Sequence, residues 1–157
     1  MATLVLLLCF LILLVLKRIR GSLSYQKIGR ISMSAMLFFI GFSHFFIPEN
    51  LTAMIPPAIP FELPIVYATG FLELLFAVLF LFDKTYKLTG KILIVYFILI
   101  WPANIYHAMN AGEIPGDIDQ YVPYYHWIRV VLIQPLFILW TWLSMRPSSD
   151  EKLSQGK

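Results

Sequence analysis

The sequence predicts an all-α membrane protein, with a four-transmembrane-helix bundle preceded by an additional N-terminal transmembrane helix. Two observations lead to this fold class. First, hydrophobic residues make up 59% of the 157 residues, charged residues make up 13%, and the mean hydropathy is +0.77. A soluble domain carries about 25% charged residues, so this chain has too few to cover a surface facing water. Second, all but one of the basic residues lie in alternate loops between the apolar stretches or after the last of them.

Apolar stretches of helical length follow one another along the chain. A helix needs about 20 residues to span the hydrocarbon core, within a range of about 17–25. The first stretch reaches this length only if Lys17 and Arg18 extend their charges to the interface and the helix continues to Ile19. The stretches are Ala2–Leu16, Ile31–Ile47, Ile65–Phe82, Ile92–Met109 and His126–Met145.

The first stretch has a second interpretation, a cleaved signal peptide. It lacks a basic region before its apolar core, and its charges follow that core. We therefore expect a retained, reversed signal-anchor. The predicted organisation is an anchor helix at residues 1–19, a bundle at residues 30–145 and a cytoplasmic tail at residues 146–157.

The distribution of charge predicts the orientation in the bilayer. Of the 12 lysines and arginines, all except Arg129 lie between the first and second stretches, between the third and fourth, or in the C-terminal tail. The loops 48–64 and 110–125 contain neither residue type. Because basic loops stay cytoplasmic, we expect the N-terminus outside and the C-terminus inside. This pattern also explains the net charge of +3, and it excludes nucleic acid as a partner.

Several kinds of chemistry find no support in the sequence. Cys9 is the single cysteine, so the chain forms no internal disulfide and contains no Cys-x-x-Cys pair. The histidines lack the spacing of metal ligands, and no nucleophile–base pair is visible. We predict no metal site and no catalytic residue, which favours a protein that is not an enzyme by itself.

Polar residues within the apolar stretches identify a candidate site. Counting at a rise of about 1.5 Å per residue, all of them fall in the outer half of the bundle. Ionisable residues at this depth are by default functional, although interhelical hydrogen bonds between such groups can also simply hold helices together. The candidates for ligand binding or a polar core are His44, Glu73, Asn104, His107, Arg129 and Gln134.

Two further expectations concern how these polar groups are satisfied. Glu73 and Arg129 are the acid and base at membrane depth, so we expect them to pair, or Glu73 to be protonated, which burial favours. Pro102 and Pro135 each remove a helix hydrogen bond and free the carbonyls of Ile98 and Val131. A neighbouring side chain must satisfy such carbonyls in lipid.

Several motifs resemble the DoxX and DoxX-like family of small integral membrane proteins. They are Gly41-Phe-Ser-His44-Phe-Phe-Ile-Pro48, Ile55-Pro-Pro-Ala-Ile-Pro60, Gly70-Phe-Leu-Glu73, Trp101-Pro-Ala-Asn104 and Trp127-Ile-Arg129 with Gln134. The resemblance covers about Arg30 to Trp142 and leaves the first stretch outside. It implies a four-helix bundle in the bacterial plasma (inner) membrane, association with a redox enzyme subunit, and site residues His44, Glu73, Asn104, Arg129 and Gln134.

These observations together predict a redox-associated accessory subunit that contacts the lipid bilayer. It would bind a quinone-like or other small apolar ligand in the outer half of the bundle, without a covalent cofactor. The proline-rich loop at residues 48–64 would be stiff and extended and would cover this site. A scaffold or assembly factor without ligand is the alternative. A small transporter is less favoured, because the inner half has no polar path.

Overall fold

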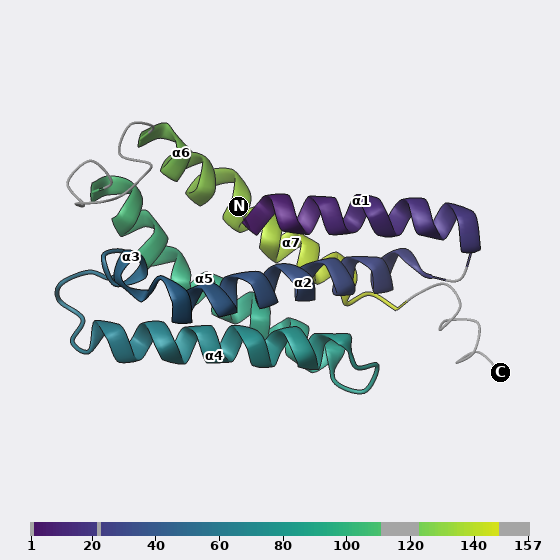
Figure 1. The fold of residues 1–157 in the computed structure, drawn as a ribbon, viewed down its shortest axis with the longest axis horizontal. Helices are drawn as coiled ribbons and strands as arrows, with labels where there is room; N and C mark the ends of the chain where they lie inside the picture. The colour runs from purple at the N-terminus through teal and green to yellow at the C-terminus, as the bar shows by residue number, and fades with distance from the viewer. Residues whose placement is uncertain (1, 22, 111–122, 148–157) are drawn as a thin grey trace.

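The computed structural model describes residues 2–21, 23–110 and 123–147, and every regular element in these ranges is helical. Figure 1 shows the order of the helices along the chain. The elements are α1 (Ala2–Arg20), α2 (Tyr25–Phe46), α3 (Pro48–Thr52), α4 (Glu62–Leu81), α5 (Tyr86–Asn110), α6 (Pro123–Ile128), the π-helical turn η2 (Arg129–Ile133) and α7 (Gln134–Ser144).

Five helical segments of the described residues are long and apolar enough to cross a membrane. This confirms the all-helical class and the five predicted apolar stretches. The fifth span is continuous through α6, η2 and α7, from His126 to Ser144. The expected C-terminal tail lies outside the described residues, except for Arg146 and Pro147.

Helix α2 begins earlier than the predicted start at Ile31. The side chain of Ser24 caps the helix, because its hydroxyl accepts a hydrogen bond from the backbone N–H of Lys27 at 3.2 Å. The first turns of α2 carry Lys27 and Arg30, so hydropathy alone does not reveal them. They lengthen the helix beyond its apolar part. This is the end of the molecule where the described lysines and arginines other than Arg129 lie, and it is called the basic end below.

The expected extended loop after α2 is partly helical instead. Pro48 stands at the first position of the short helix α3, where its fixed φ suits a helix and its missing N–H is not needed. Residues 57–64 are exposed. The prediction of an extended loop was therefore wrong for residues 48–52.

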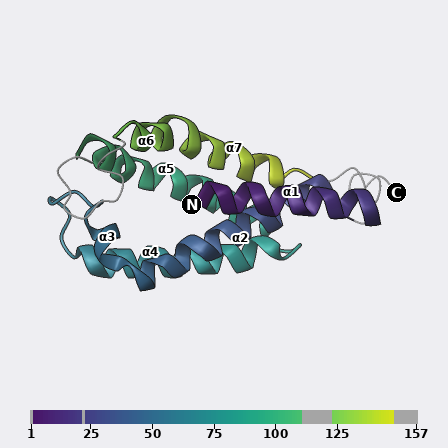
Figure 2. The same cartoon turned by 45° about the horizontal axis from the view of Figure 1, so that its top comes forward.

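Helices α2 and α4 lie side by side along most of their length, as Figures 1 and 2 show. Gly41 and Gly70 face each other at this crossing. A Cβ built on Gly70 would lie 2.5 Å from the Cβ of His44 and 3.1 Å from the Gly41 carbonyl oxygen. The glycines therefore let the two backbones approach closely, as small residues do between membrane helices.

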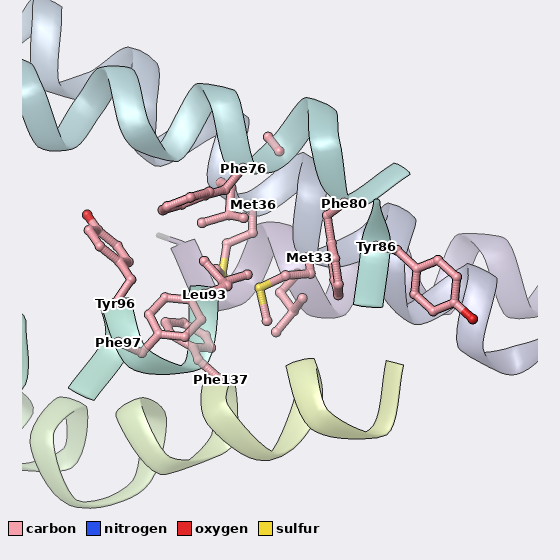
Figure 3. Packing of buried hydrophobic residues seen from close by; sticks show 12 residues of the cluster. Met33, Met36, Phe76, Phe80, Tyr86, Leu93, Tyr96, Phe97 and Phe137 are labelled. Atoms are coloured by element: carbon pink, nitrogen blue, oxygen red, sulfur yellow. The ribbon is translucent and has the colours of Figure 1, made fainter. Parts of the chain in front are cut away.

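The core is apolar and draws on all of the spanning helices. Figure 3 shows Met33 and Met36 of α2 beside Phe76 and Phe80 of α4, with aromatic rings from α5 and α7 completing the cluster. Helix α1 contributes Leu6, which is fully buried in the same cluster, while most of its other leucines are exposed. Lipid would cover these exposed side chains, since about 20 apolar residues make a spanning helix.

At the basic end, α7 is held against two glycines. Ser144 of α7 packs against Gly29 of α2, and Met145, the residue after α7, packs against Gly90 of α5. The indole N–H of Trp140 also donates a hydrogen bond to the Gly29 carbonyl oxygen at 3.1 Å. These contacts hold the C-terminal end of α7 against the N-terminal part of α2.

Candidate functional site

A buried cluster of three polar side chains joins α2, α4 and α5. Glu73 is 4% exposed, and its Oε1 accepts a hydrogen bond from the Tyr96 hydroxyl at 2.8 Å. Its other oxygen, Oε2, lies 3.4 Å from Nδ1 of His44. That ring nitrogen already donates to the Ile40 carbonyl oxygen at 2.8 Å. Oε2 has no hydrogen-bond partner in the described part of the chain.

The glycine contact between α2 and α4 brings this cluster together. His44 follows Gly41 by one helical turn, and its Cβ lies against Gly70. Glu73 is in turn one turn after Gly70, so the two pairs stack along the same crossing. Tyr96 reaches Glu73 from α5, with its ring against Phe76 at a centroid distance of 5.5 Å.

A second group of polar contacts ties α5 to the last span. An Arg129 guanidinium nitrogen donates to the Asn104 side-chain oxygen at 2.7 Å. Gln134 donates from Nε2 to the Phe97 carbonyl oxygen at 3.0 Å. Phe97 lies five residues before Pro102 in the same helix, next to Ile98, whose carbonyl the proline leaves without its helix donor. Gln134 thus donates to the carbonyl next to the expected one, and not to that of Ile98 itself.

Pro135 is preceded by the π-helical turn η2. The Gln134 backbone N–H bonds to the Arg129 carbonyl oxygen, a spacing of five residues. Proline cannot donate to Val131, and a widened turn is a common way for a helix to accommodate such a defect. The expected disturbance of the helix by Pro135 is therefore present, in the turn that runs from Arg129 to Ile133.

The histidines near the C-terminal end of α5 form a separate contact. His107 of α5 and His126 of α6 are both buried, and their rings meet edge to face at a centroid distance of 4.5 Å. The described residues contain no group of three or more metal-ligating side chains. Because its ring packs on His126, His107 lies with that residue and not with Glu73.

The candidate residues thus separate into groups. Glu73 lies with His44, Asn104 lies with Arg129, and Gln134 contacts backbone. The expected ion pair between Glu73 and Arg129 was wrong, because each of these side chains has a different partner among the described residues. Counting depth along each helix placed both residues in the same half of the bundle, but it could not tell which helices are neighbours.

Tyr96 is the residue that sequence reasoning missed. A tyrosine in an apolar stretch carries no charge and is common at interfaces, so Tyr96 did not stand out in the sequence. A weak signal did exist, since a buried carboxyl group requires a donor and Tyr96 offers a hydroxyl within the adjacent span. Its partner could be assigned only after α4 and α5 were placed together.

Two surface grooves lie away from Glu73. One, of about 370 Å³, runs between α5 and α7 and is lined by Trp101, Pro135, Ile138, Leu139 and Trp142. The other, of about 330 Å³, lies where α1, α2 and α7 meet. The carboxyl group of Glu73 lines neither of them.

The fold and these polar groups define a class of protein, an all-helical chain with a polar cluster inside helices that can cross a membrane. The chain belongs to the family described as Domain of unknown function (DUF8561), whose model matches residues 33–145. No curated protein and no solved structure matches the chain.

Proposed function

We propose that this protein is a multi-pass membrane protein that binds a small, largely apolar, quinone-like molecule in the outer half of its helical bundle. The observation that carries the proposal is Glu73. It is a buried carboxyl group that is oriented through one oxygen by Tyr96, while the other oxygen lacks a hydrogen bond in the described residues. Buried polar groups are normally satisfied, so an incomplete one is a candidate for a ligand contact.

The chemistry of this carboxyl group suits a quinone or quinol. As a carboxylate, Oε2 would accept a hydrogen bond from a quinol hydroxyl. As a neutral acid, it would donate one to a quinone carbonyl. Nδ1 of His44 lies 3.4 Å from the same oxygen, but its hydrogen is donated to the Ile40 carbonyl oxygen, so Oε2 remains available for a ligand. Such hydrogen bonds are stronger in a low-dielectric interior than in water.

The arrangement of the helices suggests the direction of approach. The outer part of α5, together with α6, diverges from the α2–α4 pair, as Figures 1 and 2 show. We place the apolar body of the ligand beside Oε2 of Glu73, the oxygen that has no hydrogen-bond partner in the described residues. In this proposal, the Arg129–Asn104 contact and the Gln134–Phe97 contact fix the wall opposite Glu73.

The cellular role in this proposal rests on two sequence observations. The resemblance to the DoxX family supports an accessory subunit of a redox enzyme in the bacterial plasma membrane. The distribution of basic residues supports an N-terminus outside and a C-terminus inside. Because Cys9 is the single cysteine, any dithiol chemistry would belong to the partner subunit.

The test is extraction of the purified protein with organic solvent, followed by chromatography and mass spectrometry. Wild type is expected to retain a stoichiometric quinone-like molecule, and Glu73→Gln to retain at least about tenfold less, a change of about 1.4 kcal/mol. Glu62→Gln is the matched control, because it removes an exposed carboxylate from the first turn of the same helix. Equal retention in Glu73→Gln and wild type contradicts the proposal.

A scaffold function is the second candidate, and a specific observation favours it. The polar contacts join helices to one another, and neither described groove reaches Glu73. If the cluster only holds helices together, replacing the bonded pair by Glu73→Leu with Tyr96→Phe is expected to be close to neutral. Each single change should destabilise, because it leaves a partner group unsatisfied. A purified wild type that carries a stoichiometric protein partner and no small molecule would support this function.

A further inference from the structure

The groove at the basic end of the molecule has one apolar part and one polar part. It lies between α1, α2 and α7, which Figures 1 and 2 show side by side at that end. Phe10, Trp140 and Leu143 form its apolar walls, and the rings of Phe10 and Trp140 meet edge to face at 4.7 Å. The Trp140 N–H is already bonded to Gly29, so the indole presents an apolar surface.

The polar part of the groove combines hydrogen-bonding groups with a cation. Tyr25 and Gln26 come from the first turn of α2, where backbone N–H groups carry a partial positive charge. Ser144 and Arg146 come from the end of the last span. The Arg146 guanidinium is stacked on Trp142 at 3.7 Å and has no acidic partner in the described residues.

The surroundings of the groove are also positive. The Lys17 ammonium group lies 3.2 Å above the Tyr25 ring, at the edge of the groove. Asp83 is the one acidic residue described at this end, and it pairs with Arg30 at 3.3 Å. Other cations at this end, among the side chains that the structure describes, are Arg18, Lys27, Lys84, Lys87 and Lys91.

We infer that this groove is a binding site for an anionic glycerophospholipid from the leaflet at the basic end. The phosphate would lie against Arg146, Gln26 and the first turn of α2, and one acyl chain would lie along Phe10, Trp140 and Leu143. The volume of about 330 Å³ is at the small end of ligand pockets, which fits part of one chain and not a whole lipid. Basic groups next to a spanning helix are attracted to anionic lipids, by about 1 kcal/mol for each lysine or arginine.

Native mass spectrometry of the full chain tests this site. Delipidated protein is titrated with phosphatidylglycerol, and in parallel with phosphatidylcholine. Wild type is expected to bind one phosphatidylglycerol at least about fivefold more tightly than phosphatidylcholine. Arg146→Gln should weaken that binding about fivefold, the factor that corresponds to one cation. Arg18→Gln, an exposed change of the same charge at the same end, should leave it within about twofold.

A second pair of variants tests the apolar part. Leu143→Trp is expected to fill the groove and to weaken phosphatidylglycerol binding at least about fivefold, whereas Leu139→Trp, which lies in the other groove, should not.

Equal losses in Arg146→Gln and Arg18→Gln would overturn the site in favour of general charge attraction. Displacement of the lipid by millimolar inorganic phosphate would overturn the acyl-chain contact and leave an anion site only. Equal binding of both lipids would overturn recognition of charge.

Discussion

Glu73 has two chemically different oxygens because Tyr96 bonds to only one of them. The Tyr96 hydroxyl lies 2.8 Å from Oε1, and His44 lies 3.4 Å from Oε2. A carboxyl group held in this way keeps a fixed orientation, which a ligand contact requires. The same arrangement also joins three helices, so the function of the cluster must be separated from its structural effect.

Removal of the tyrosine hydroxyl should reveal the structural effect. Tyr96→Phe keeps the ring against Phe76 and leaves Oε1 of Glu73 without its donor. We expect a loss of about 1–2 kcal/mol in the free energy of unfolding, measured by denaturation in mixed micelles. Tyr67→Phe is the control, because that ring is exposed and stacks on Phe45. Equal stability of Tyr96→Phe and wild type would show that the hydrogen bond contributes little.

Arg30 is a second residue whose chemistry is specific. It is 5% exposed, pairs with Asp83 at 3.3 Å and stacks on Tyr86 at 3.9 Å. Lysine would keep the charge but lose the planar stacking. Arg30→Lys is therefore expected to lower the free energy of unfolding by about 1 kcal/mol in the same denaturation assay. Lys84→Arg, at the exposed turn beside Asp83, should have no measurable effect.

At the scale of helices, the crossing of α2 and α4 positions the site. Gly70→Ala would place a methyl group 2.5 Å from the Cβ of His44 and 3.1 Å from the Gly41 carbonyl. Because the nearest atoms belong to a backbone and to the base of a side chain, the helices must separate. We expect a loss of about 1–3 kcal/mol in stability and weaker ligand retention. Ala68→Ser adds one atom on the exposed face of the same helix and should have neither effect.

The sequence predicted helices better than it predicted their ends. Apolar length identified all five spans, but α2 extends back to Tyr25 because Ser24 caps polar turns that hydropathy cannot recognise. Pro48 was read as a residue of an extended loop, although proline also favours the first turn of a helix. Pro135 was correctly expected to disturb its helix, which widens into η2 before it.

The candidate site could be predicted only in part, because the sequence shows the single helices but not how they pack against one another. Depth along each helix can be counted from the sequence, and polar side chains from several helices are indeed buried. The choice of partner depends on which helices are adjacent and on their rotation, which no single helix encodes. Glu73 therefore pairs with Tyr96 and His44, while the expected partner Arg129 contacts Asn104.

For the whole molecule, the orientation in the membrane can be tested directly. Single cysteines at Glu62→Cys and Lys84→Cys, in a chain carrying Cys9→Ala, report opposite ends of α4. In intact cells, a membrane-impermeant thiol reagent is expected to label the first variant, and the second only after permeabilisation. The reverse pattern of labelling would contradict an N-terminus outside.

The central claim is that Glu73 contacts a quinone-like ligand, and infrared difference spectroscopy measures this contact most directly. A short-chain benzoquinone is added to delipidated protein, and the bands of the carboxyl group are compared before and after binding. We expect a change in one buried carboxyl band in wild type and in Glu62→Gln, and none in Glu73→Gln. Binding that leaves the carboxyl bands of wild type unchanged, or a band change that persists in Glu73→Gln, would contradict the claim.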